Sequence, residues 1–383
     1  MVLLGRVPGV HARRLEAVRW AVDGAVRGGR VGLTAIGRHG QGSAAAKHRI
    51  KRSDRLLRNE KLFQNHDAFF RAVAAGIVGD RDTVVVLIDW THLDTHCALV
   101  AAVPHSGRSV PILFEVHEAR HYSNRDVQAE FLARLRRILP DACKPILVTD
   151  AGFRAPWVKE AGEQGLAVVT RISGCSKLGS EGAWQTVDQI AAQAEAVPTD
   201  LGTVLLTTTN RLEVRAVRAA RYVPPSPPRK PQLRKTGKKG YAEVKKASTQ
   251  PWVLATSLDI PASEVVRLYA LRMQIEEQFR DHKSHRFGLS LRYTRASSVV
   301  RRANLLLLAS LVEFVLAVVG RIAEARGLPR RFQANTIRNR RVLSLQFIAR
   351  AMLDSCHHAL VHARSLKREL HCLQRAVHSL APT

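Results

Sequence analysis

The sequence predicts an α/β protein whose central domain contains a mixed β-sheet and is flanked by helical regions. Apolar strand-like runs alternate with amphipathic helical segments between residues 83 and 172. Helical periodicity dominates residues 1–80 and 291–383. The chain has 383 residues, 46% of them hydrophobic, which suffices for about two or three domains. We therefore expect a helical domain over 1–80, an α/β domain over 81–290 and a C-terminal helical domain over 291–383.

The N-terminal region is helical and strongly basic. Residues 11–26 and 62–78 have helical periodicity, and glycine-broken helical pieces lie between them. Residues 1–60 hold 13 Lys and Arg against 4 Asp and Glu, and the whole chain has a net charge of +28. Such an excess favours a polyanionic partner, first nucleic acid and second an anionic membrane surface. We expect a compact DNA-binding domain here; a solvated basic helical face is the alternative.

The central region predicts a mixed sheet. Its strands alternate with helices in the order of three strands, helix, strand, helix, strand. The expected elements are strands 83–90, 96–104 and 109–119, helix 125–139, strand 144–150, helix 155–164 and strand 166–172.

A β-rich insertion is expected over residues 174–250. Strands are predicted at 203–209 and 212–223, and residues 223–240 form a loop rich in Pro and Lys. Residues 211–246 hold 12 Lys and Arg against 2 acids. Strand 252–258 returns the chain to the sheet, and a helix capped by Ser263 follows it.

The longest apolar run, Leu305–Val319, predicts a buried helix. It is shorter than the roughly 20 residues that a membrane span needs, and it contains Glu313. The five cysteines form neither a zinc pattern nor a disulfide framework, which fits a reducing compartment. We therefore expect a cytoplasmic protein without a membrane partner.

Four polar residues form the most informative pattern: Tyr269, Arg272, Glu276 and Lys283. On one continuous helix their spacing places all four side chains within a stripe about 60° wide. A carboxylate between two cations and a phenol suits a metal ion bound beside a phosphate backbone. Glu277 is turned by about 100° from the stripe, so Glu276 is the better ligand candidate.

Two aspartates complete a candidate metal site with Glu276. Asp89 and Asp150 each end an apolar strand, at the sheet edge where α/β proteins place their sites. Three carboxylates suit Mg²⁺ or Mn²⁺, and two such ions support phosphodiester chemistry. The alternative is that the aspartates are turn residues and the helix charges are surface ion pairs. The chain has no Gly-Lys-Ser/Thr phosphate loop, so no nucleotide cofactor is expected.

The spacing Tyr-x2-Arg-x3-Glu-x6-Lys resembles the signature of the DDE transposases of insertion-sequence family four. Further stretches resemble the subgroup typified by insertion sequence ten, so the likeness extends over about residues 47–345. These stretches are KHRIKRSDRLLRN, LIDW, GRSVPILFE, TDAGFRAPW, PWVLATSL, RMQIEEQFRDHKS, RFGLSLRYTRASS and FQANTIRNRRVLS. The wider family often has Asp-Arg-Gly-Phe where this chain has Asp150-Ala151-Gly152-Phe153, a form that the subgroup shares.

The resemblance implies a ribonuclease-H-like core and a role for each site residue. Asp89, Asp150 and Glu276 match the catalytic triad that binds Mg²⁺, for which Mn²⁺ can substitute. The DNA-binding residues that it implies are Tyr269, Arg272 and Lys283 at phosphates, Trp252 stacked on a flipped base, and Met273 as an apolar wedge. Core packing is the alternative for Trp252 and for Met273.

The implied function is cut-and-paste DNA transposition. The N-terminal domain would bind terminal inverted repeats, and the triad would cleave the ends through a hairpin intermediate and join them to target DNA. A dimer in the synaptic complex and a bacterial, nucleoid-associated location follow from the same resemblance. The alternatives are a ribonuclease-H-like nuclease without strand transfer and a catalytically silent DNA-binding protein.

Overall fold

The computed structural model divides the chain into two compact units. The first is Met1–Lys144 with Met273–Ala381, and the second is Pro145–Arg272 with Pro382–Thr383. The residues that the structure describes are 3, 5–172, 174, 176–220, 250–284, 289, 291, 298–334, 336–337 and 339–382. Residues of the predicted N-terminal and C-terminal helical regions lie in the first unit with the first three strands. The predicted domain boundaries stay a prediction.

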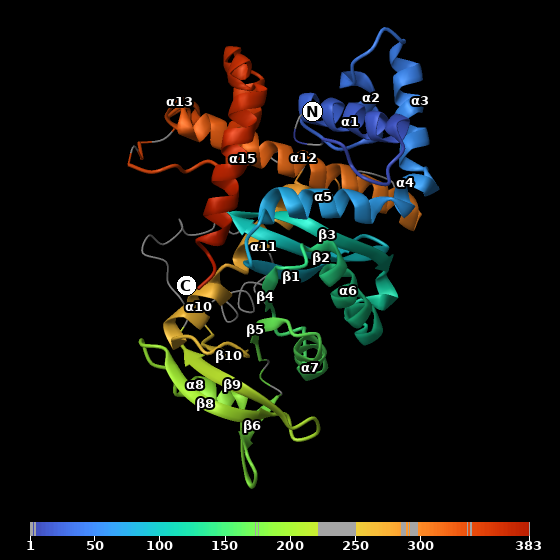
Figure 1. The fold of residues 1–383 in the computed structure, drawn as a ribbon. Coiled ribbons are helices and arrows are strands. Elements are labelled where there is room, and N and C mark those ends of the chain that lie inside the picture. Colours follow the sequence, from blue (N-terminus) through green and yellow to red (C-terminus); the bar gives the residue numbers. More distant parts are fainter. Residues whose placement is uncertain are drawn as a thin grey trace, which may run out of the picture. The chain divides into compact units, whose positions relative to one another are not determined.

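Three antiparallel strands form the sheet of the first unit, in the order β3-β2-β1 (Figure 1). They are β1 (Thr83–Leu93), β2 (His96–His105) and β3 (Arg108–Glu118). The three predicted strands are confirmed, but the expectation that Asp89 ends its strand is wrong. Asp89 pairs with Val100 inside β1, because the β-compatible residues Trp90 and Thr91 continue the ladder toward Leu93.

Helices cover this sheet. The first unit contains α1 (Ala12–Arg27), α2 (Leu33–His39), α3 (Ala46–Leu57), α4 (Glu60–Gln64), α5 (His66–Val78), η2 (Ala119–His121), α6 (Arg125–Ile138), α11 (Met273–Lys283), α12 (Val299–Ala325), α13 (Pro329–Phe332), α14 (Leu345–Leu353), η4 (Cys356–Leu360) and α15 (Ala363–His378). Helices α5, α6 and α12 contact β3, and α15 contacts β1 and β2. The helix predicted over 62–78 is divided at Asn65 into α4 and α5.

Helix α12 is the core helix that the apolar run predicts. It is the one helix among the described residues that is both long enough and apolar enough to cross a membrane. However, 89% of its apolar 18-residue stretch is buried inside the protein. Glu313, near its middle, has no exposed surface. Gly320 lets α14 approach closely, because a Cβ there would lie 2.5 Å from the backbone oxygen of Leu345. A larger residue at position 320 would force the two helices apart.

A buried polar contact fastens the N-terminal helices to α12. The ring Nε2 of His66 lies 2.8 Å from Oδ1 of Asn304, and the Asn304 amide donates to the backbone oxygens of Leu57 and Asn59, each at 3.1 Å. His66 is 2% exposed. Burial lowers the pKa of His66 to about 4, although its bond to Asn304 opposes the shift.

Acidification should therefore destabilise the protein through His66. Because the folded pKa is about 4 and the ordinary value is 6.5, this stabilisation is complete above pH 6.5 and is lost as the pH falls toward 4. The shift corresponds to about 3 kcal/mol in the free energy of unfolding. Urea denaturation at pH 7 and pH 4.5 should show a smaller pH effect in His66→Gln than in the wild type. An equal pH effect in the two proteins would refute this role.

The sheet of the second unit contains strands of the predicted central domain (β4, β5 and β10) and strands of the predicted insertion (β6 to β9). Its strand order is β4-β5-β10-β9-β8-β6-β7, with β4 and β5 parallel and the other pairs antiparallel. The strands are β4 (Lys144–Thr149), β5 (Ala167–Arg171), β6 (Lys177–Ser180), β7 (Ala183–Thr186), β8 (Thr199–Leu206), β9 (Leu212–Ala219) and β10 (Trp252–Thr256). The β-rich character of the insertion is confirmed; the basic loop 223–240 lies outside the described residues.

Among the described residues of the second unit, the helices are α7 (Ala155–Glu163), α8 (Val187–Ala192) and α10 (Ala262–Ala270). The sequence predicts α7 but not α8, whose start is fixed by a capping box between Thr186 and Gln189. Helix α10 begins directly after Pro261, so the predicted cap at Ser263 is wrong.

The prediction of one continuous helix through the polar stripe is also wrong. Helix α10 ends at Ala270 and α11 begins at Met273. Between them the backbone N–H groups of Leu271 and Arg272 donate to residues three positions earlier, at 3.1 and 3.0 Å, so the turn tightens. The four polar residues are thus shared between two helices.

Candidate functional site

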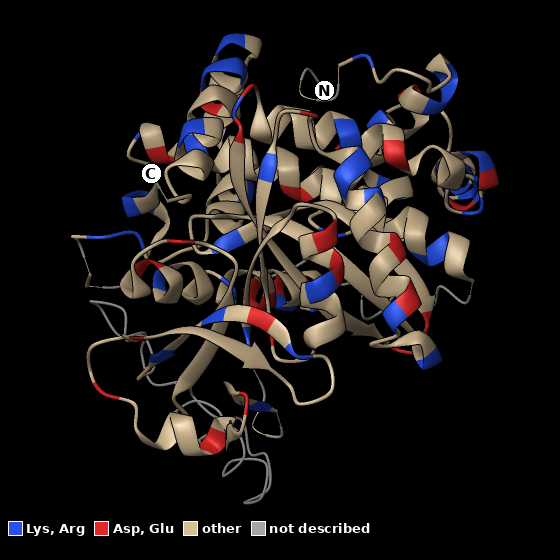
Figure 2. Cartoon of the chain, turned by 60° about the horizontal axis from the view of Figure 1, so that its bottom comes forward, with Lys and Arg blue, Asp and Glu red and all other residues tan. Residues whose placement is uncertain are grey.

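Positive charge is distributed over both units. Figure 2 shows Lys and Arg on helices and strands throughout the described chain, interspersed with fewer acids. The whole chain holds 60 Lys and Arg against 32 Asp and Glu. This distribution is typical of a protein that contacts a polyanion over a wide surface.

Asp150 lies where the sequence predicts it, directly after the buried strand β4. Its Oδ1 accepts a hydrogen bond of 2.9 Å from the backbone N–H of Gly152. Its backbone oxygen accepts a bond of 3.2 Å from the Thr170 hydroxyl, which in turn accepts one of 2.8 Å from Thr149. A Cβ at position 152 would lie 3.0 Å from Asp150 Oδ1, so glycine leaves room for the carboxylate. These contacts orient the carboxylate before any ligand arrives.

An aromatic pair, Trp252 and Tyr269, lies in the same unit as Asp150. The rings of Trp252 and Tyr269 meet edge to face with centroids 4.7 Å apart, and both side chains are buried. Burial raises the pKa of the Tyr269 hydroxyl. The carboxylate of Asp150 adds to this shift, while the cations Arg272 and Arg171 oppose it. Three charged groups, Asp150, Arg171 and Arg272, therefore act on the Tyr269 phenol.

Arg171 is a member of this cluster that sequence reasoning missed. Parallel pairing of β4 with β5 sets Thr149 opposite Thr170, so Asp150 and Arg171 follow at neighbouring strand ends. The Arg171 guanidinium donates to the side-chain oxygen of Gln250 at 2.9 Å. The two apolar strands were identified, and a parallel alignment of their ends would have pointed to this arginine.

Asp89 lies in the first unit, within strand β1 rather than at the end of that strand. Its side chain is half-buried, and its Oδ1 accepts a bond of 2.8 Å from the backbone N–H of Trp90. That local bond fixes the rotamer of the carboxylate. Asp89 is thus a carboxylate that a local hydrogen bond orients, at a position where β1 is paired with β2.

Helix α11 presents Glu276 and Lys283 on one face. The two residues are seven positions apart, which places their side chains within about 20° on a helix. Both are half-buried. Gln274 and Gln278 lie on the opposite face, where the helix docks onto its neighbours. Of the four residues of the predicted stripe, Glu276 and Lys283 therefore share one face of α11.

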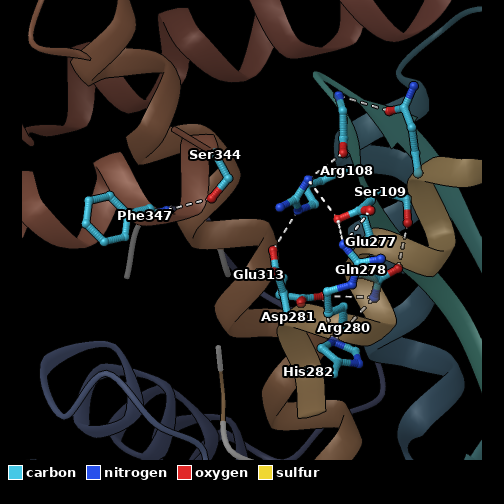
Figure 3. Close-up of polar contacts among 12 residues, drawn as sticks. Arg108, Ser109, Glu277, Gln278, Arg280, Asp281, His282, Glu313, Ser344 and Phe347 are labelled. Carbon is cyan, nitrogen blue, oxygen red and sulfur yellow. Dashed lines mark hydrogen bonds and ion pairs between the residues drawn. The ribbon is translucent and has the colours of Figure 1, made fainter. Parts of the chain in front are cut away.

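The docking face of α11 is held by hydrogen bonds to the start of β3 (Figure 3). The backbone N–H of Gly107 donates to Gln274 at 3.2 Å, and the Ser109 hydroxyl donates to Gln278 at 2.6 Å. Arg108 forms an ion pair of 2.7 Å with Asp281. These contacts fix the rotation of α11 about its axis, and with it the direction of Glu276.

A buried carboxylate of α12 completes this support. Glu313 Oε2 accepts a hydrogen bond of 3.0 Å from Gln278 and lies 2.8 Å from Nε2 of His282. Burial raises the pKa of Glu313, while His282 and the Gln278 bond oppose the rise. Glu313, which argued against a membrane-spanning helix in the sequence, is thus a buried partner of α11.

Two further predicted residues differ in exposure. Met273, the first residue of α11, is 44% exposed, so the alternative that it is a core methionine is wrong. Trp252 is 8% exposed and lies in a strand between β5 and β9, where its ring packs against Tyr269. In this conformation Trp252 has the packing of a core residue.

The three predicted metal ligands belong to different units. Asp89 and Glu276 lie in the first and Asp150 lies in the second. Within the described part of the chain, no three or more His, Cys, Asp or Glu side chains are grouped so as to hold a metal ion. All three carboxylates are half-buried and offer oxygen donors, which is the chemistry that a hard divalent cation accepts. The metal-binding triad therefore stays a prediction, and its carboxylate oxygens suit a divalent cation.

Comparison with known proteins adds one finding. A family model described as a transposase DDE domain matches residues 80–312, which is more than half of the chain. The matched span contains Asp89, Asp150 and Glu276. No curated protein sequence matches the chain.

Proposed function

Because the chain belongs to the family of transposase DDE domains, we propose that it is a cut-and-paste DNA transposase of the insertion sequence ten subgroup of family four, with a ribonuclease-H-like core. It excises a DNA element by cleaving phosphodiester bonds at the element's ends, and it joins those ends to target DNA. The observation that carries this proposal is the family match over residues 80–312, together with a net charge of +28. The orienting contacts around Asp150 and Glu276 support it.

The carboxylates of Asp89, Asp150 and Glu276 are the proposed metal ligands. Mg²⁺ is the expected ion, and Mn²⁺ can replace it because both accept carboxylate oxygens. Bound divalent ions supply Lewis-acid stabilisation of the attacking and leaving oxygens during phosphodiester displacement. The chain's own task is to hold the ligands in place: local backbone bonds do this for two of them, and the docking of α11 does it for Glu276.

Basic residues near these carboxylates are proposed to bind the DNA phosphates at the cut. Arg272 and Arg171 carry guanidinium groups that can bind a phosphate with two hydrogen bonds, and Lys283 adds a point charge on the face of Glu276. The Tyr269 hydroxyl, whose pKa is raised by burial, is a hydrogen-bond donor. Exposed Met273 at the start of α11 is the proposed apolar wedge.

The remaining steps follow from the same chemistry. The N-terminal helices α1–α5 bind the terminal inverted repeats, and hydrolysis frees a 3′-hydroxyl at each end. Attack of that hydroxyl on the opposite strand gives a hairpin, a second hydrolysis opens it, and strand transfer follows. Each step is a displacement at phosphorus, so one set of carboxylates serves all of them. Pairing two ends requires at least two protomers in the DNA complex.

Replacing Trp252 tests the hairpin step. Stacking of a flipped base on an aromatic ring stabilises it by about 1–3 kcal/mol, so Trp252→Ala should slow hairpin formation about tenfold or more relative to first-strand nicking. Trp252 is buried against Tyr269, so Trp252→Phe is the matched control that keeps an aromatic ring in the strand. Single-turnover rates of nicking and of hairpin formation separate the two effects. Equal slowing of both steps in Trp252→Ala would assign the ring to packing alone.

The direct test of the proposed function is the reaction of the wild-type protein with a DNA fragment carrying the gene's own flanks and Mg²⁺. Excised product with hairpin ends, followed by joined product, is the expected result. Cut DNA without any joined product would instead favour a nuclease. Binding without any cleavage would favour a catalytically silent DNA-binding protein.

A further inference from the structure

On the last helix, α15, which is labelled in Figure 1, the exposed basic residues and the buried residues lie on different faces. Its exposed basic residues fall within an arc of about 100°. They are Arg364, Lys367, Arg368, His371 and Arg375. The buried residues lie on the opposite side of the helix. They are Ser365, Leu366, Glu369, Leu373 and Val377.

The exposed face of α15 carries no acid. Glu369, the one acid in the helix, is 3% exposed and faces inward. It pairs there with Arg368 at 3.0 Å and with Arg321 at 3.7 Å. Positive charge also predominates in the whole C-terminal segment, since residues 321–383 hold 12 Lys and Arg against 3 acids. The exposed face therefore has a uniform positive charge.

Polar contacts at its C-terminal end fix α15 on the first unit. The two ring nitrogens of His378 lie 2.8 Å from the backbone oxygen of Thr83 and 2.7 Å from that of Val78. The side-chain amide of Gln374 donates to the backbone oxygen of Gly76 at 3.1 Å. Because these contacts and the apolar face hold the helix, its basic face is presented in a fixed orientation.

We propose that the exposed face of α15 is a second DNA-binding surface, which binds the phosphate backbone of duplex DNA of any sequence. Arg364 and Arg375 are separated by about 16 Å along the helix, a length that corresponds to about five base-pair steps along the axis of a DNA duplex. Backbone contacts position DNA without selecting its sequence. The inference rests on the proposed function only for the identity of the polyanion as DNA.

The test is the salt dependence of DNA binding by the triple variant Arg364→Gln, Lys367→Gln, Arg375→Gln. Each phosphate contact contributes about 0.9 to the slope of log affinity against log salt, so the slope should fall by about two to three. Affinity at about 0.1 M salt should fall tenfold or more. The loss should be the same on a duplex with the element's end and on a duplex of unrelated sequence.

A matched control removes the same charge from the same unit. Arg125→Gln, Arg137→Gln, Lys144→Gln replaces three other exposed cations, and its slope should stay within about one unit of the wild type. The double variant Arg364→Lys, Arg375→Lys keeps the charges and should retain the wild-type slope. Thermal unfolding of the triple variant should match the wild type, since the replaced side chains are exposed.

Three results would overturn the proposal. An unchanged slope in the triple variant would remove α15 from DNA binding, and an equal loss in the control would attribute the effect to net charge. A loss confined to the duplex with the element's end would make α15 part of sequence recognition. A change in oligomeric state with an unchanged slope, measured by sedimentation, would assign the face to a protein partner. None of these results bears on whether the protein cleaves DNA.

Discussion

Glu276→Gln is expected to abolish DNA cleavage while leaving binding to the element's ends within about twofold of the wild type. The substitution removes one proposed ligand charge and keeps the size of the side chain. A bound metal ion stabilises the transition state by several kcal/mol, so the cleavage rate should fall by about a thousandfold or more when a ligand is lost. The docking contacts of α11 are made by Gln274, Gln278 and Asp281, so the helix should keep its place. Single-turnover cleavage in Mg²⁺ measures the effect.

Glu277→Gln is the matched control for this experiment. Glu277 is the next residue of α11, turned by about 100°, and it forms ion pairs with Arg280 at 2.7 Å and Arg108 at 3.7 Å. Such partly exposed pairs contribute about 0–1 kcal/mol, so cleavage should stay within about threefold of the wild type. Cleavage retained in Glu276→Gln, or lost equally in both variants, would remove Glu276 from the site.

Glu313→Ala is expected to lower the free energy of unfolding by about 3–5 kcal/mol. The substitution leaves His282 and Gln278 without their buried partner. It also leaves a cavity where the Glu313 side chain packs against α11. Since burial already raises the pKa of Glu313, the isosteric Glu313→Gln should cost much less. Urea denaturation of the three proteins gives the comparison.

Glu324→Ala on the same helix is the control for this effect. Its carboxylate pairs with Arg341 at 2.9 Å, but 41% of the side chain is exposed. The expected loss is therefore about 1 kcal/mol or less. A loss this small in Glu313→Ala would show that the buried contacts do not hold α11 to α12.

Most strands of both units follow from local sequence, and so does the position of Asp150, but β6 and β7 were not predicted. Apolar runs of strand length identified β1–β5 and β10, because burial on a sheet selects such residues. The end of β1 could not be located in the same way. An apolar run reports burial, whereas Trp90 and Thr91 continue the pairing with β2. Asp89 therefore lies inside a strand although its neighbours suggested an end.

Features that depend on distant partners were missed. No Pro or Gly marks the break between α10 and α11, so the helical period continued through Leu271 and Arg272. Arg171 joins the Asp150 cluster through parallel pairing, which no local pattern specifies. Glu313 meets Gln278 across 35 residues, so the sequence indicated only that this acid disfavours a membrane span.

The proposed function requires that Asp89 and Asp150 each take part in metal-dependent DNA cleavage. The most direct measurement compares Mg²⁺-dependent products of Asp89→Asn, from the first unit, and Asp150→Asn, from the second, on DNA with the gene's own flanks. We predict that each variant binds the DNA ends as the wild type does and yields no nicked, hairpin or joined product. Normal cleavage by either variant would contradict the claim.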